Sequence, residues 1–134
     1  MSEKILIVDD DPALLRALPQ SLQHRMPNLE IRTAGDVHDA LAAAAAGEFD
    51  CVLCDIRMPV IDGVALMVKL RELRPHTPVI LMTGAGEDRL RRQALHAGAS
   101  AFITKPLDPD FLAGLISVVM QDAKMSRLLP TSAG

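Results

Sequence analysis

No uninterrupted apolar run in this 134-residue chain approaches the ~18 residues that a membrane-spanning helix needs. The first residues, Met1 to Lys4, lack the pattern of a secretory signal peptide. The chain also lacks an excess of basic residues, because 14 Lys and Arg stand against 17 Asp and Glu. Domains that bind nucleic acid directly usually carry a basic face. These absences predict a cytoplasmic protein that binds neither a membrane nor a nucleic acid.

Cysteine is scarce, and its two copies form a single C-x-x-C pair, Cys51 and Cys54, with no second pair to complete a zinc site. Both lie inside an apolar run that is typical of a strand. Residues three apart on a strand point to opposite faces, with Cα atoms ~10 Å apart, which is too far for a disulfide. We therefore interpret both cysteines as small core residues.

Basic residues cluster at one place, Arg89, Arg91 and Arg92. The charge pattern alone favours a solvated helix face over a binding patch.

Short apolar runs and helical patterns alternate along the whole chain. The runs at residues 5–8, 51–54, 79–82 and 102–103 are typical of buried parallel strands, whereas residues 29–34 alternate as an edge strand does. Helical spacing or alanine enrichment marks the segments between them, such as residues 14–22, 40–46, 66–73 and 111–119. Strict alternation predicts an α/β domain of three layers, α/β/α, around a five-stranded parallel sheet.

Turn and cap residues support these boundaries. Asp11 and Asp108 each precede a proline, which is the pattern of an N-cap followed by the first helical residue. Pro19 falls inside the first helix, where we expect it to kink or shorten that helix. We predict one folded domain over residues 1–122, followed by a C-terminal tail or truncated linker over residues 123–134.

Polar side chains follow the ends of four predicted strands. They are Asp9, Asp10, Asp55, Thr83 and Lys105. In an open parallel sheet, ligands bind outside the carboxyl ends of the strands, so these side chains should face one crevice. Clustered carboxylates repel one another unless a cation lies among them, and Mg²⁺ prefers such hard oxygen ligands. A carboxylate nucleophile with a metal and a lysine suits phosphoryl transfer.

Several segments together resemble the signature of receiver domains of two-component response regulators. They are residues 5–12 (ILIVDDDP), 55–63 (DIRMPVIDG), 82–85 (MTGA), 98–99 (GA) and 105–106 (KP). The similarity extends over roughly residues 3–121, with the segments in order and at the family's spacing. It implies a flavodoxin-like, doubly wound sheet with strand order 2-1-3-4-5.

The resemblance also implies roles for single residues. Asp55 would be the phosphoacceptor, and Mg²⁺ would be bound by Asp10 directly, by Asp9 partly through water, by Asp55 and by the backbone carbonyl of Arg57. The residues that bind the phosphoryl group and form the switch would be Thr83, Gly84, Lys105 and Phe102, the last being the aromatic ring that moves inward. The Lys105–Pro106 peptide bond would be cis.

The partners that the resemblance implies are a histidine kinase or a histidine phosphotransfer protein, and a downstream partner or effector domain. The downstream contact would use the face formed by the fourth helix, the fifth strand and the fifth helix, where a phosphorylation-dependent homodimer is also possible. Phe102 stands where tyrosine is common, so a hydroxyl-dependent part of the switch is absent.

Other readings of the same residues fare less well. A phosphatase of the haloacid dehalogenase type needs a second aspartate two residues after the nucleophile, but position 57 is Arg. A flavodoxin would want a phosphate-binding loop after the first strand, where three aspartates would repel the phosphate. An interaction module that works without phosphorylation stays as an alternative.

Overall fold

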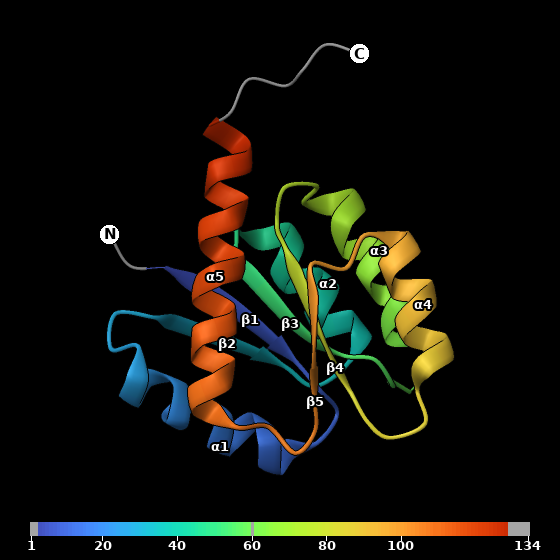
Figure 1. Cartoon of the computed structure of the whole chain (residues 1–134), viewed down its shortest axis with the longest axis horizontal. Helices are drawn as coiled ribbons and strands as arrows, with labels where there is room; N and C mark the ends of the chain where they lie inside the picture. Colours follow the sequence, from blue (N-terminus) through green and yellow to red (C-terminus); the bar gives the residue numbers. More distant parts are fainter. Residues whose placement is uncertain (1–2, 60, 129–134) are drawn as a thin grey trace.

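The computed structural model describes residues 3–59 and 61–128. Five strands form one parallel sheet in the order β2-β1-β3-β4-β5, as predicted (Figure 1). The strands are β1 (Lys4–Val8), β2 (Glu30–Ala34), β3 (Cys51–Asp55), β4 (Val79–Thr83) and β5 (Ala101–Thr104). The alternating strand β2 lies at an edge, whereas β1, β3 and β4 are interior strands, and their central apolar side chains are buried on both faces.

A helix follows every strand. The helices are α1 (Pro12–Arg25), α2 (Val37–Ala46), α3 (Gly63–Leu73), α4 (Asp88–Ala97) and α5 (Pro109–Leu128). Asp11 caps α1 as predicted, accepting a hydrogen bond from the Ala13 amide at 2.9 Å. Asp108 does the same for α5, accepting from the Asp110 amide at 3.0 Å. The chain therefore enters these helices directly from the loops that follow β1 and β5.

The sheet separates two apolar cores. On one face, α2, α3 and α4 pack against side chains such as Leu6, Val8 and Leu81. On the other face, α1 and α5 cover Ile5 and Ile7 and their neighbours. Cys54 lies in the first core and Cys51 in the second, both as free thiols, which confirms that the pair is structural.

Helices α1 and α5 both extend further than the sequence patterns indicated. Helix α1 does not end at Pro19 but continues to Arg25, because the buried Leu18 and Leu22 hold it against the sheet on both sides of the proline. Helix α5 continues to Leu128, so residues 123–128, which the sequence assigned to a tail or truncated linker, are helical. The Lys124 ammonium lies 2.9 Å from a Glu3 carboxylate oxygen and ties this last part of α5 to the chain before β1. Residues 129–134 lie outside the described part of the chain.

Among the described residues, no helix is both long enough and apolar enough to cross a membrane.

Candidate functional site

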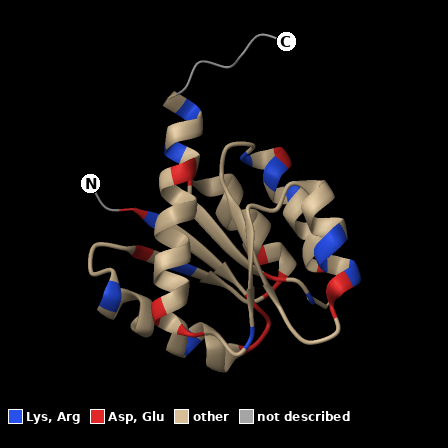
Figure 2. Cartoon of the chain, viewed as in Figure 1, with Lys and Arg blue, Asp and Glu red and all other residues tan. Residues whose placement is uncertain are grey.

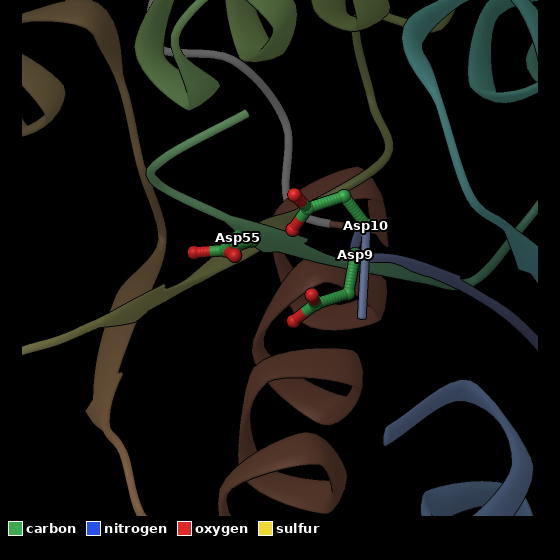
Figure 3. Close-up of side chains that lie close together, drawn as sticks. All are labelled: Asp9, Asp10 and Asp55. Atoms are coloured by element: carbon green, nitrogen blue, oxygen red, sulfur yellow. The ribbon is translucent and has the colours of Figure 1, made fainter. Parts of the chain in front are cut away.

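Three aspartates meet at the edge of the sheet where the strands end. Asp9 and Asp10 follow β1, and Asp55 is the last residue of β3 (Figure 3). One carboxylate oxygen from each lies within 4.8 Å of the others. Asp9 is fully buried and Asp55 is nearly so, whereas Asp10 is exposed. Acidic segments gather at the same edge in Figure 2. The three side chains that the sequence placed in one crevice are therefore together.

Lys105, which follows β5, reaches across the sheet to this cluster. Its ammonium donates hydrogen bonds to Asp9 Oδ2 at 2.8 Å and to Asp55 Oδ2 at 3.3 Å. Burial by itself would lower the pKa of Lys105, but the hydrogen bond to Asp9 and the negative charges of both aspartates outweigh that effect and raise the pKa. Lys105 is thus a charged ammonium that bridges two carboxylates.

The environment of Asp55 disfavours the charged form of its carboxyl group. Burial raises its pKa, and the nearby Asp9 raises it further, against the lowering effects of the Arg57 amide and of Lys105. The Arg57 amide donates to Asp55 Oδ1 at 3.2 Å and so fixes the orientation of the carboxylate. One lysine therefore does not compensate the acidic cluster fully.

The cluster fits a hard divalent cation. It offers three carboxylates with oxygens close enough to share one ion, and two of them are buried with a single ammonium as their cation among the described residues. Mg²⁺ typically uses one or two carboxylates and keeps several waters, and the exposed side of Asp10 leaves room for those waters. Oxygen donors of this kind, without His or Cys, do not favour zinc.

The predicted threonine, Thr83, is the last residue of β4 and so lies at the same edge, but its hydroxyl is engaged elsewhere. Thr83 is fully buried, and its Oγ1 donates to the Ile103 carbonyl at 3.4 Å. Within residues 3–59 and 61–128 the Thr83 hydroxyl makes no hydrogen bond to Asp55 or Lys105, although the Lys105 amide donates to the Thr83 carbonyl at 2.7 Å. The next amide, of Gly84, donates to Glu87 Oε2 at 2.7 Å.

Glu87 and Arg91 are parts of this region that the sequence prediction missed. Glu87 is buried, holds the Gly84 amide and pairs with the exposed side chain of Arg57. Arg91, interpreted as part of a solvated face, donates to Thr83 Oγ1 at 3.0 Å. A signal was available, because Glu87, Arg91 and the buried Ala94 are spaced at i, i+4 and i+7 and so share one helix face.

The aromatic ring and the peptide bond named by the resemblance are also in place. Phe102 is half-buried and packs against the core under α2, α3 and α4. The Lys105–Pro106 peptide bond is cis.

Comparison with known proteins adds the family. The model of the response regulator receiver domain matches residues 5–117, which is most of the chain. The chain belongs to this family. Receiver domains are the phosphoacceptor signalling domains of two-component response regulators, and the fold described above is the one this family shares.

Several relatives are similar to this receiver domain. The transcriptional regulatory protein SrrA of Staphylococcus aureus is 36% identical over 109 residues, covering 81% of this chain and 44% of SrrA. The chain thus spans less than half the length of that relative. A CheY-like receiver domain protein from Methanospirillum hungatei is 32% identical, with a TM-score of 0.87 and coverage of 94% of this chain and 99% of that one. NtrX from Brucella abortus is 30% identical with a TM-score of 0.87, covering 98% of this chain and 31% of NtrX.

Proposed function

We propose that this receiver domain accepts a phosphoryl group on Asp55 from a phosphohistidine of a histidine kinase or phosphotransfer protein. In this reaction a carboxylate oxygen of Asp55 forms a bond to phosphorus, the bond between phosphorus and the imidazole nitrogen breaks, and the imidazole keeps the electron pair. The observation that carries the proposal is the position of Asp55, which lies at the end of the central strand with the other two carboxylates and the Lys105 ammonium around it.

The surrounding residues would neutralise and hold the transferred group. Asp9, Asp10, Asp55 and the carbonyl of Arg57 would hold Mg²⁺, which when bound supplies positive charge against the oxygens of the phosphoryl group. Lys105 already contacts Asp55 Oδ2 and is placed to pair with an added phosphoryl oxygen. Thr83 and the Gly84 amide would donate hydrogen bonds to the same group, which requires both to leave their present partners.

The signal would leave through the face formed by α4, β5 and α5. Exposed apolar side chains lie on both helices, among them Leu95 on α4 and Phe111 and Val118 on α5, each more than half exposed. Such residues suit a protein surface that binds a partner or a second copy of the chain. Phe102 belongs to β5, which pairs with the strand that carries Thr83, and packs in the core under α4, so its movement would link Thr83 to this face. We propose that the domain acts on a protein partner and does not itself bind nucleic acid.

Phosphorylation by acetyl phosphate with Mg²⁺, followed by intact-mass measurement, tests the proposal. One phosphoryl group should be added to the wild type and none to Asp55→Asn. Asp10→Ala should also prevent labelling, because it removes a metal ligand and leaves Asp55 in place. Asp11→Asn is the matched control, because this neighbouring side chain only caps α1 and asparagine caps equally well.

The outcomes separate the proposals. Labelling that persists in Asp55→Asn would assign the acceptor to another residue. Labelling of Asp10→Ala at the wild-type rate would remove Asp10 from the metal site while leaving Asp55 as acceptor. A wild-type protein that switches partners without being labelled would favour the alternative, an interaction module independent of phosphorylation.

A further inference from the structure

Helix α4 carries three arginines, but they do not share one environment. Arg89 and Arg92 are exposed. The side chain of Arg91 is only 34% exposed, because it turns from the helix toward the ends of β4 and β5. Figure 2 shows basic segments along α4. The hydrogen bonds of Arg91 show that its side chain turns inward. Arg91 therefore differs from its neighbours in what it touches, although all three carry the same charge.

The guanidinium of Arg91 bridges two hydroxyl groups. Its Nη2 donates to Thr83 Oγ1 at 3.0 Å and to Thr104 Oγ1 at 3.1 Å. Its Nη1 lies 3.8 Å from Asp88 Oδ1, a weak ion pair near the surface. Its Nε is buried without a hydrogen-bond partner among the described residues. A charged group that gives up water and leaves one donor unpaired is poorly explained by the stability of α4 alone.

The hydroxyl of Thr83 acts both as an acceptor and as a donor in this arrangement. It accepts from Arg91 and donates to the Ile103 carbonyl at 3.4 Å. Its single proton cannot be donated to an oxygen at Asp55 while it is donated to Ile103. A group bound at Asp55 therefore competes with the Ile103 carbonyl for this proton, and a shift of Oγ1 toward Asp55 would also break its contact with Arg91.

We propose that Arg91 is a positioning residue that holds Thr83 in its unphosphorylated arrangement. This inference rests on the proposed function, in which Thr83 moves to bind the group on Asp55. Movement of Thr83 breaks its hydrogen bond with Arg91, and this bond is a direct side-chain link between the end of β4 and α4. Phosphorylation thereby removes this link between β4 and α4, and α4 is part of the proposed signalling surface. The same bond opposes activation, since its loss is part of the free energy that separates the two states.

Titration calorimetry with beryllofluoride and Mg²⁺ on the full chain measures how strongly the Arg91–Thr83 hydrogen bond opposes activation. Removing the bond should favour the activated arrangement, so Arg91→Ala should bind beryllofluoride about tenfold more tightly than the wild type, which is ~1.4 kcal/mol. Arg89→Ala and Arg92→Ala are matched controls on the same helix with the same loss of charge, and both should stay within about twofold of the wild type. Thr104→Val removes one end of the bridge at an exposed position and should shift the affinity in the same direction by about two- to threefold.

Coupling to Thr83 distinguishes positioning from packing. In a Thr83→Ala background, Arg91→Ala should give no further gain, because the side chain that Arg91 holds is gone. A merely structural role would give the same effect in both backgrounds. Thermal unfolding of each variant shows whether it is folded. If Arg91→Ala does not fold, Thr104→Val is used for the test in its place.

Three results would overturn the inference. Arg91→Ala binding beryllofluoride like Arg92→Ala would show that the bond does not oppose activation. Weaker binding by a folded Arg91→Ala would show that Arg91 supports the activated arrangement. An equal gain with and without Thr83 would show that the effect does not act through the threonine. In each case beryllofluoride binding by the wild type would leave the proposed function intact, whereas no binding by the wild type would refute both.

Discussion

Asp55→Asn should stabilise the fold at neutral pH in the absence of Mg²⁺. The Lys105 ammonium lies 3.3 Å from Asp55, which corresponds to an attraction of about 5 kcal/mol at an effective dielectric constant of ~20. Asp9 has an oxygen within 4.8 Å, and the repulsion is at least about 3.5 kcal/mol on the same basis. The balance favours the charge by roughly 1.5 kcal/mol at most, but removing an ionised carboxylate from water costs several kcal/mol.

The net cost that the substitution removes is therefore about 1–3 kcal/mol, equivalent to a rise in Tm of roughly 4–10 °C for a domain of this size. Asparagine keeps an oxygen for the Arg57 amide, so this hydrogen bond is not lost. Chemical denaturation of both proteins in EDTA measures the difference. Asp11→Asn, at the exposed cap beside the cluster, should change the free energy of unfolding by less than about 0.5 kcal/mol.

The pH dependence gives the sign of the effect. Because the pKa of Asp55 is raised in the folded state, its proton is bound more tightly there than in the unfolded chain. The free-energy cost of the buried Asp55 charge is fully present above the folded-state pKa of Asp55, and it disappears as the pH falls below the unfolded-state pKa. The advantage of Asp55→Asn should therefore shrink toward zero in acid. A variant that is no more stable than the wild type at neutral pH, or an advantage that is unchanged in acid, would refute this reasoning.

Gly63→Ala should destabilise the domain by about 2 kcal/mol or more, because an added Cβ would lie 2.2 Å from the Asp55 carbonyl oxygen. Gly47→Ala is the control and should be nearly neutral, because an added Cβ there would meet open space. Denaturant unfolding measures both. Neither cysteine should react with a thiol reagent until the protein unfolds. Burial raises the pKa of Cys51 to about 12 and also raises the pKa of Cys54, so little reactive thiolate is present. Rapid labelling in native buffer would contradict this. Beryllofluoride with Mg²⁺ should shift amide NMR signals across residues 84–105 as well as around Asp55, and a response limited to the acidic pocket would exclude the proposed signalling face.

The strands and their order followed from sequence patterns of two kinds. Apolar runs located β1, β3 and β4, because strands buried on both faces show no alternation, and alternation placed β2 at an edge. The strand order itself came from the resemblance, since alternating elements are compatible with several orders. The aspartates and Lys105 were found because each directly follows a strand, where backbone direction alone places them at one edge.

The parts that were missed depend on side-chain direction. Arg91 shares its charge and its helix with Arg89 and Arg92, and only the packing of α4 on the sheet decides which of them points inward. The hydroxyl of Thr83 was expected beside Asp55, but neighbouring donors and acceptors turn it toward β5 and α4. The polar end of α5 resembled a tail because a helix that has left the sheet no longer needs an apolar stripe.

The division of the interior into two cores has a consequence for protein engineering. Phe102, the ring proposed to move, packs in the core covered by α2, α3 and α4. Among the described residues, the core under α1 and α5 includes neither Phe102 nor Thr83. Repacking that second core on the α1 side, for example around Leu18 and Leu22, should therefore add thermal tolerance while leaving the activation threshold unchanged. Thermal stability and the threshold for activation can then be changed separately, by substitutions on opposite faces of the sheet.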